Sequence, residues 1–316
     1  DTLQSMNDVP LSCYTALEWV RYAEKWLLNA GIKRPEITTL RLNILLIMAH
    51  NIHGMNRSKA WLATGTLLKQ AMLSGYHRDP SKYVKISVFN KEMRRRIWVT
   101  MVELDLQVAI DRGMPPTVQA SDYDTAAPLN INDDEIHENT TELPMGRPLS
   151  ESTDSSFQAV MSRSLPLRLK ACSLMHSPRI NCRYDDILRM DWEFNRHLSA
   201  IPAWPISEDI RMQHKVRLTK ALLETRIGQW LLCIHTPFAV EAQKEPLFAP
   251  SARARLEVAT MMLSTQRQLH ETSWQLSLSN MGDWTLHACC SVLQVLHARD
   301  NIRGESTDFG PVDYTK

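Results

Sequence analysis

Apolar side chains recur at three- and four-residue steps along most of this chain, with polar side chains between them. That spacing places the apolar residues on one face of an α-helix. Three such rows are Met93, Ile97, Met101, Leu104 and Val108; Val216, Leu223, Ile227, Trp230 and Ile234; and Met281, Trp284, Ala288, Val292 and Val295. We find no convincing run of alternating β-branched residues, which is the signature of a half-buried strand. The pattern therefore predicts an all-α fold.

Helical segments are predicted along almost the whole chain, which we expect to form one large helical domain over residues 1–316 with roughly nine or more helices. The predicted helices cover residues 14–30, 37–55, 58–75, 90–112, 156–176, 183–200, 207–236, 251–272 and 280–299. The segments 37–55 and 280–299 are apolar around more than half of the helix circumference. We expect these two helices to lie centrally, covered by their neighbours.

Two stretches lack this periodicity. Residues 113–155 are rich in proline, aspartate and serine and are predicted to be an irregular loop within the domain. Its end, 142–156, has the composition of a flexible loop. Residues 237–250 contain three prolines and are predicted to link two helices, and the tail after Arg303 is predicted to be a loop.

Composition narrows the class of protein. Hydrophobic residues make up 44% of 316 residues, which is enough for a full-sized core. The net charge is +1, from 36 basic and 35 acidic residues, so the overall charge gives no reason to bind DNA or an anionic membrane. No apolar run reaches the roughly 18 residues that a membrane span requires. The first residue is not methionine, and we expect the sequence to be a fragment of a longer protein.

The six cysteines do not have the spacing of a local metal site. They are Cys13, Cys172, Cys182, Cys233, Cys289 and Cys290, and no two of them form a CxxC pair. A structural zinc site requires soft ligands that converge tetrahedrally. We interpret the cysteines as reduced, mostly buried thiols and expect no metal site; a metal or disulfide role is the alternative.

Three consecutive arginines, Arg94, Arg95 and Arg96, suggest either a nucleic-acid patch, a localisation signal or a set of ion pairs. Glu92 precedes Arg95 and Arg96 by three and four residues, which is the spacing of favourable pairs on a helix. Phosphate binding normally recruits several basic residues over one face. We therefore favour ion pairing over DNA contact.

Asp105 lies on a predicted helix among apolar neighbours, Met101, Val102, Val108 and Ala109. A buried carboxylate requires a partner, because an unpaired buried charge costs several kcal/mol. We predict a partner among Arg78, Arg94, Arg95 and Arg112, in a pair that fixes this helix against the 58–75 helix. The alternative is a catalytic acid.

Other chemistry has weak support in the sequence. Gly113 suits the end of a helix, and Ser121, Asp122 and Asp124 suit turns that they cap themselves. The acidic runs 133–138 and 185–186 suggest magnesium and diphosphate chemistry, but His137 occupies the position where an acid would be needed. HExxH, GxSxG, GxGxxG and the phosphate-binding GxxxxGK[ST] are absent, and His50 and His53 lack a third ligand nearby. We predict neither catalytic residues nor a cofactor or metal site.

Nine tryptophans and 15 methionines are many for this length. We interpret them mainly as core side chains. If the chain has a ligand pocket, we expect it to be apolar and lined by Trp and Met from the central helices.

The order of several short motifs resembles the middle homology region of fungal zinc-cluster transcription factors. The elements that carry the resemblance are His77, Arg78 and Asp79; Arg94, Arg95, Arg96 and Trp98; Asp105; Gly113 and Pro115; Asp122 and Asp124; Pro128, Asn130 and Asp133; and, after a helix, His235, Pro237 and Phe238, followed by Ser251 at the start of another helix. Each element alone is weak, but their order and spacing are specific. Three features depart from the family pattern: Met114 stands where Gly-Arg-Pro has its arginine, Val99 replaces a common tryptophan, and Arg255 and Leu256 occupy the region where a cysteine often follows the late serine.

The resemblance implies a non-enzymatic regulatory domain in the nucleus, controlling an attached DNA-binding module. The family's six-cysteine zinc cluster is not in this sequence, so we expect zinc only in the DNA-binding module and no specific DNA binding by this chain. The candidate partners are a small-molecule effector, a second copy of the chain, and co-regulators or the transcription machinery. Two alternatives stay open: a helical enzyme acting on an apolar metabolite, and a scaffold for dimerisation or docking.

Overall fold

The computed structural model describes residues 13–29, 35–52, 57–177, 182–205, 208–272 and 288–293. Within these ranges all regular elements are helices and no strand occurs, so the all-α prediction is confirmed. The chain divides into two compact units, Asp1–Asn181 (unit 1) and Cys182–Lys316 (unit 2). The expectation of one domain over residues 1–316 stays a prediction.

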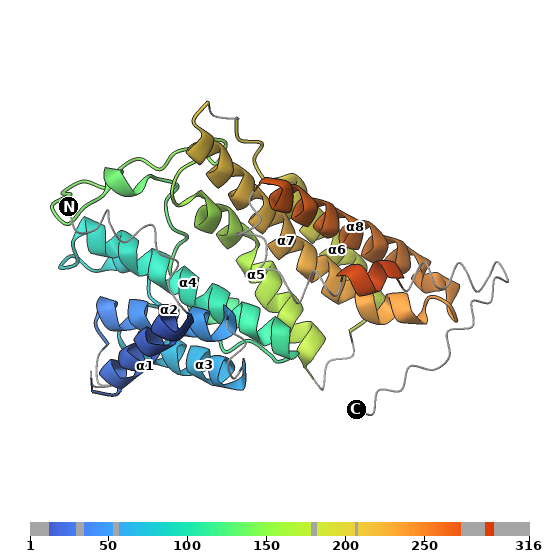
Figure 1. The fold of residues 1–316 in the computed structure, drawn as a ribbon, viewed down its shortest axis with the longest axis horizontal. Coiled ribbons are helices and arrows are strands. Elements are labelled where there is room, and N and C mark those ends of the chain that lie inside the picture. The colour runs from blue at the N-terminus through green and yellow to red at the C-terminus, as the bar shows by residue number, and fades with distance from the viewer. Residues whose placement is uncertain are drawn as a thin grey trace. The chain divides into compact units, whose positions relative to one another are not determined.

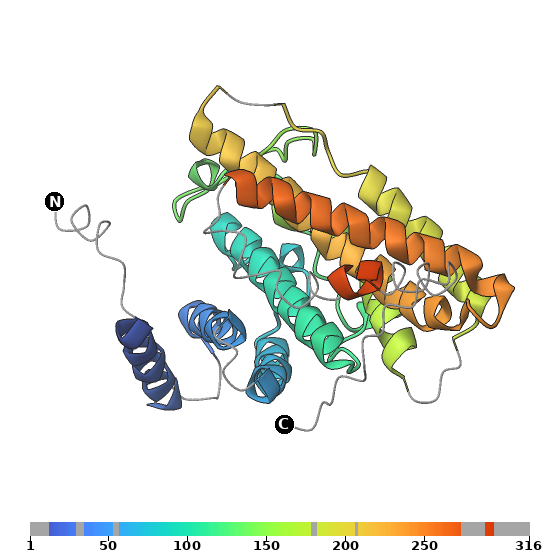
Figure 2. The ribbon, with the colours of Figure 1, turned by 45° about the vertical axis from the view of Figure 1, so that its right-hand side comes forward.

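Unit 1 is a row of helices in which each helix packs on the next. The helices are α1 (Cys13–Asn29), α2 (Ile37–Ile52), α3 (Arg57–Leu73), α4 (Val88–Arg112) and α5 (Ser156–His176). Helix α1 packs on α2, α2 on α3, α3 on α4, and α4 on α5 (Figures 1 and 2). Helix α1 therefore lies at the edge of the row and has one packed face.

Helix α4 is the central element of unit 1. The Ser87 hydroxyl accepts the Asn90 amide at its start, and Gly113 ends it with φ 63°, a left-handed conformation that favours glycine. Its predicted apolar row is buried apart from a half-buried Leu104, and other faces of α4, including Trp98, are buried too. The helix predicted over 37–55 is not covered by its neighbours at Leu45 on α2, which is 61% exposed, so this part of the prediction is wrong.

The irregular loop predicted over 113–155 is present and contains two short 3-10 turns, η2 (Ala120–Asp122) and η3 (Asp133–Glu135). A third turn, η1 (Pro80–Lys82), precedes α4. The loop is anchored by apolar contacts at the start of α4, where Ile131 and Ile136 pack with Met93 in one buried cluster. The loop therefore shares a core with α4.

Unit 2 is built on α6 (Tyr184–Ser199), α7 (Ile210–Glu241) and α8 (Ala249–Thr272), with the turn η4 (Pro246–Phe248) before α8. Helix α7 packs on both α6 and α8. At Gly228 the helices α7 and α8 approach so closely that an added Cβ would lie 2.9 Å from Met261 Cε. The glycine therefore permits this close contact.

The predicted helix end at residue 236 is wrong, because α7 continues through Pro237 to Glu241. A proline inside a helix removes one amide hydrogen bond and disturbs the preceding turn. Only four residues of α7 follow Pro237, so the proline affects the hydrogen bonds of only the last part of the helix. Of the predicted 280–299 helix, residues 288–293 are helical, and the rest lies outside the described residues together with the tail after Arg303.

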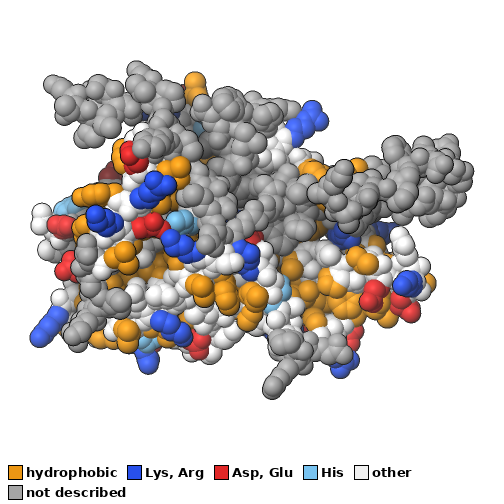
Figure 3. Space-filling model, turned by 60° about the horizontal axis from the view of Figure 1, so that its bottom comes forward, with side chains coloured by type: hydrophobic (Ala, Val, Ile, Leu, Met, Phe, Trp, Pro, Cys, Tyr) orange, Lys and Arg blue, Asp and Glu red, His pale blue; other side chains and the backbone are white. Residues whose placement is uncertain are grey.

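None of the helices that the structure describes is both long and apolar enough to cross a membrane. On the face drawn in Figure 3, basic and acidic side chains are interspersed among hydrophobic ones. This distribution agrees with the net charge of +1.

Candidate functional site

The motif residues of unit 1 converge where the loop 113–155 meets the turn before α4, and Asp79 is the centre of this contact. Its carboxylate accepts two hydrogen bonds from Arg95, from Nε at 3.1 Å and from Nη2 at 2.9 Å. It also accepts the backbone amides of Ser81 and of Ala126 in the loop. Burial alone would raise the pKa of Asp79, but these hydrogen bonds outweigh it and hold the pKa well below its usual range.

Asp124 makes the reciprocal contact from the loop. Its carboxylate accepts the Asp79 amide at 2.7 Å and is paired with Lys82, while its own amide donates to the His77 carbonyl at 3.0 Å. The Lys82 pair and the Asp79 amide lower the pKa of Asp124. Each of the two aspartates therefore accepts a backbone amide from the other segment, Asp79 from the loop and Asp124 from the turn. This one contact explains why both aspartates belong to the motif.

The three arginines of α4 have three different partners. Arg95 pairs with Asp79, which corrects the predicted pair of Arg95 with Glu92. Arg96 does pair with Glu92, at 3.1 Å, and also reaches Asp133 in η3 at 2.6 Å. Ion pairing is therefore the role of Arg95 and Arg96 in this structure.

Arg94 differs from these two arginines. Its guanidinium carbon lies 4.2 Å from the centre of the Tyr76 ring, and its Nη2 donates to the Ser74 carbonyl. Among the described residues, no Asp or Glu side chain forms an ion pair with it. The cation–π contact compensates only part of its charge.

Glu92 is fully buried and links α4 to the loop. Its Oε1 accepts both Arg96 Nε and the Leu129 amide, each at 3.1 Å. Burial raises the pKa of Glu92 in spite of these bonds. The sequence indicated only the local contact with the arginines, because nothing near Glu92 marks Leu129 as a partner.

Trp98 is fully buried under the loop. Its ring centre lies 5.5 Å from that of Tyr123 in an edge-on contact and 6.3 Å from that of His77. Arg78, the next residue in the motif, is exposed. Burial, with the charge of Glu103, raises the pKa of Tyr123 to about 12, so this phenol stays neutral. Trp98 is thus a core side chain that the loop covers.

The Asn130 side chain is hydrogen-bonded to the last part of the loop 113–155. Its Nδ2 donates to the carbonyls of Pro148 and Glu151, both at 3.0 Å, and its Oδ1 accepts the hydroxyls of Thr153 and Ser156. The second half of the segment predicted to be flexible, 142–156, is therefore fastened to the motif. The neighbouring Pro128 is buried.

Asp105 has a partner that the sequence analysis did not predict. Its two carboxylate oxygens accept the Thr117 amide at 2.7 Å and the Thr117 hydroxyl at 2.6 Å, and Thr64 on α3 lies close enough to lower its pKa. The predicted arginine partner is wrong, because the chain turns back after Gly113 and brings Thr117 over the carboxylate. Burial raises the pKa of Asp105. The expected contact with the 58–75 helix is made through Thr64.

The remaining motif residues of the loop cap or fill turns. Asp122 accepts the Gln119 amide at 2.7 Å, which confirms the predicted self-capped turn. Pro115, after Gly113, is exposed at the helix end. Arg168 of α5 makes a two-nitrogen contact with Glu103 of α4, which the sequence analysis missed.

In unit 2, His235 is the centre of a second network. Its Nε2 lies 2.9 Å from Asp191 Oδ1 on α6, and its Nδ1 lies 2.9 Å from the Ser251 hydroxyl at the start of α8. That hydroxyl also lies 3.3 Å from the Tyr184 hydroxyl. His235 is 1% exposed and Ser251 0%, so the Ser–His–Asp arrangement is closed to a substrate and connects three helices. The motif in the sequence includes His235 and Ser251, but no sequence signal indicated Asp191 or Tyr184 as their partners.

Phe238 extends this network with an aromatic cluster. Its ring centre lies 5.0 Å from that of Tyr184 and 5.1 Å from that of Phe248 in η4. Pro237 precedes it within α7. The His-x-Pro-Phe motif therefore fastens α7 to α6 and to the turn before α8.

Several of the acids considered for metal chemistry are paired with arginines. Glu135 pairs with Arg147 at 2.9 Å, and Asp186 pairs with Arg189 at 3.1 Å. His50 lies 3.0 Å from Glu24 on α1. His53 lies outside the described residues.

Unit 1 has two cavities of note. One, of about 380 Å³, lies at the start of α4, and the other, of about 210 Å³, lies among α1, α2 and α3. Neither is lined by Trp or Met among its described residues, so neither has the lining predicted for a ligand pocket. The tryptophans with the lowest exposure, Trp98 and Trp230, are core side chains.

Comparison with known proteins places these motifs in context. The family model described as "Fungal specific transcription factor domain" matches residues 5–204, more than half of the chain. Transcription factor lepE of Aspergillus flavus is 31% identical over 82% of this chain and 31% of its own length. The pyrrolocin cluster transcription factor fsdR of a fungal species is 29% identical over 80% of this chain and 35% of its own length.

The Zn(2)-C6 fungal-type transcription factor pigI of Monascus ruber is 26% identical over 74% of this chain and 29% of its own length. The chain thus spans about a third of the length of these relatives. No solved structure matches it.

Proposed function

Because this chain belongs to the fungal specific transcription factor domain family, we propose that it is the regulatory domain of a zinc-cluster transcription regulator. In this role it acts in the nucleus and controls transcription through an attached DNA-binding module. Zinc belongs to that module, and this domain neither binds DNA specifically nor catalyses a reaction. Since one relative is named "Pyrrolocin cluster transcription factor", control of a cluster of genes is the specific proposal.

One observation carries this proposal. Arg95 and Arg96, two of the three arginines that could suggest DNA contact, are paired with Asp79, Glu92 and Asp133 inside the contact between α4 and the loop. Paired arginines are not available to neutralise DNA phosphates. The motif therefore supports a role in maintaining a particular arrangement of helix and loop.

The proposed mechanism is a shift between two arrangements of the domain. An effector or partner protein that binds one arrangement more tightly moves the population towards it. The contact centred on Asp79 is a candidate for the element that differs, because it joins the loop to α4 through several bonds that break together.

The proposal is tested in a reporter assay with the whole chain placed between an unrelated DNA-binding module and an activation segment. The chain is expected to alter reporter output relative to a direct fusion of the two segments, and Asp79→Asn is expected to change that output. Asp134→Asn, at an exposed acid of the same loop that is not a motif residue, is the matched control. Equal output from all four proteins, at equal protein levels, would contradict a regulatory role.

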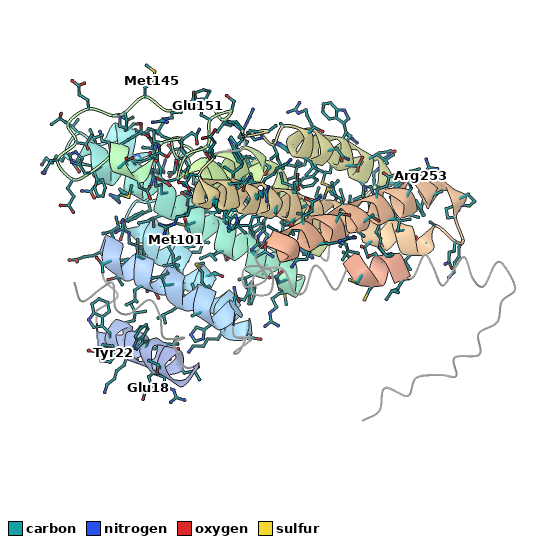
Figure 4. The ribbon with its side chains drawn as sticks, turned by 45° about the horizontal axis from the view of Figure 1, so that its top comes forward. Glu18, Tyr22, Met101, Met145, Glu151 and Arg253 are labelled. Carbon is teal, nitrogen blue, oxygen red and sulfur yellow. The ribbon has the colours of Figure 1, made fainter. Side chains whose placement is uncertain are left out.

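A second candidate function is docking or dimerisation. Trp19, Tyr22 and Trp26 follow one another along α1 and are 56%, 75% and 44% exposed; Figure 4 labels Tyr22 on this helix at the edge of unit 1. Exposed aromatic side chains in a row are characteristic of contact surfaces. Native mass spectrometry distinguishes the candidates: a stable dimer without bound ligand favours docking, a bound small molecule favours effector control, and conversion of that molecule favours an enzyme.

A further inference from the structure

The larger cavity of unit 1 lies between the start of α2, the turn after α3 and the first turns of α4. It has a volume of about 380 Å³, which is within the range of small-molecule sites. Its walls include the half-buried side chains of Ile37 and Ile86 and the polar side chains of Ser87 and Asn90. The cavity can therefore contact both carbon and polar atoms of a ligand.

Two cations line this cavity, Arg94 and Lys85. Arg94 Nε is buried without a hydrogen-bond partner in the described part of the chain. Its neighbours Arg95 and Arg96 are both neutralised by carboxylates. Among three consecutive arginines, the one at the cavity is thus the one without an acidic partner in the residues described.

Lys85 is exposed at the cavity and has no ion pair within the described ranges. No Asp or Glu is among the described lining residues. The phenol of Tyr76 lines the same space; burial raises its pKa, and the nearby charges of Arg94 and Arg41 are positive. Positive charge without a balancing carboxylate attracts an anion, and a charged group bonded to an anion makes the stronger class of hydrogen bond.

We propose that this cavity binds a small molecule through an anionic group, a carboxylate or a phosphate. Arg94 and Lys85 contact the anionic oxygens, Tyr76 and Asn90 donate further hydrogen bonds, and Ile37 and Ile86 contact the carbon part of the ligand. Binding itself is independent of the proposed function, while its effect on transcription rests on that function.

The test uses the whole chain with ¹³C-labelled isoleucine methyl groups and three probes: phenyl phosphate, benzoate and the neutral benzyl alcohol. The methyl signals of Ile37 and Ile86 are expected to shift saturably with phenyl phosphate or benzoate, while Ile187, buried in unit 2, stays unchanged. The anion that binds more tightly identifies the group as phosphate or carboxylate. Shifts of equal size with benzyl alcohol, or no saturable shift with either anion, would overturn the proposal.

Substitutions locate the binding. Lys85→Ala and Arg94→Gln are each expected to weaken anion binding on the order of tenfold, because each removes one charged contact. Lys170→Ala, at an exposed lysine on α5, is the matched control and is expected to leave affinity unchanged. If Arg94→Gln does not fold, Lys85→Ala still tests the proposal, because Lys85 is exposed and its removal should not affect folding. Wild-type anion affinity of Lys85→Ala would contradict the proposal.

The consequence for transcription is measured separately in the reporter. Loss of methyl shifts in Lys85→Ala with an unchanged reporter response would retain the binding site and reject its role as effector site. An absence of binding, with a chain that still alters reporter output, would reject the site and retain the proposed function.

Discussion

Unit 1 joins its irregular loop to its central helix with charged side chains, whereas unit 2 joins its helices mainly by close packing. In unit 1 the contact is carried by Asp79 and Arg95, with further bonds from Asp124. In unit 2 the ring of Trp230 stacks on that of Phe194, and α7 and α8 meet closely at Gly228. Carboxylates titrate and apolar contacts do not, so the stability of the two units should respond differently to pH.

The largest expected effect is in the packed unit. Trp230→Ala removes a fully buried indole and is expected to lower the free energy of unfolding by about 3–5 kcal/mol. The loss should be the same at pH 5 and pH 7. Urea unfolding measures it, and faster hydrogen exchange in α7 and α8 locates it. Trp192→Ala, at a tryptophan that is 62% exposed, is the control, with an expected loss under about 1 kcal/mol.

The second-largest loss of stability is expected for the charged contact of unit 1. Asp79→Ala leaves Arg95 without its carboxylate and is expected to cost about 3 kcal/mol at pH 7. The pKa of Asp79 is lowered in the folded state, so its contribution is present above the unfolded pKa of about 3.9 and is lost as the pH falls towards the folded value. The difference between wild type and variant should therefore shrink in acid. A cost that stays constant from pH 7 to pH 3 would contradict this account, and Asp134→Ala, at an exposed acid of the same loop, is the control.

The polar network of unit 2 should have an intermediate effect. His235→Ala leaves the Ser251 hydroxyl and the Asp191 carboxylate without their imidazole partner, at an expected cost of about 2 kcal/mol. His214→Ala, an exposed histidine of the same helix, should change stability by less than about 0.5 kcal/mol. Equal costs for both variants, measured by urea unfolding, would show that the network contributes no stability.

The smallest effect is expected at Asp105, a second carboxylate of unit 1, whose pKa is shifted in the opposite direction to that of Asp79. Asp105→Asn keeps a side chain that can bond to Thr117 and should cost less than about 1 kcal/mol at pH 5. The pKa of Asp105 is raised in the folded state, so wild-type stability decreases as the pH rises from the unfolded value through the folded value. Asparagine does not titrate, so the difference in free energy of unfolding should shift in favour of the variant as the pH rises from about 4 towards neutral. A shift in the opposite direction would contradict the raised pKa.

Local signals in the sequence predicted most helix limits. The helix predicted over 156–176 is α5 (Ser156–His176), and the one over 90–112 begins two residues late but ends correctly at Arg112. The end is correct because Gly113 takes up the left-handed conformation that its residue type favours. Periodicity and end residues act within a few positions of the chain, so they can be recognised without knowledge of the fold.

Partners across long separations could not be predicted in the same way. Thr117 reaches Asp105 because the chain reverses after Gly113, and Asp191 reaches His235 across 44 positions because α6 packs on α7. The sequence around either acid contains no mark of these contacts. The family pattern did indicate which residues belong together in unit 1, but it did not specify the bonds between them.

Hydrogen bonds from Asn130 to Pro148 and Glu151 hold together the two ends of a surface loop, and Arg147 adds an ion pair with Glu135. Met145 in this surface loop is 92% exposed and is labelled at the edge of the molecule in Figure 4. Because the two ends are already held together, extra residues at the exposed Glu142 would add little loop-closure entropy. This position therefore suits the insertion of a fluorescent reporter or an affinity tag, which would make the protein traceable in living fungal cells while leaving both chain ends unaltered.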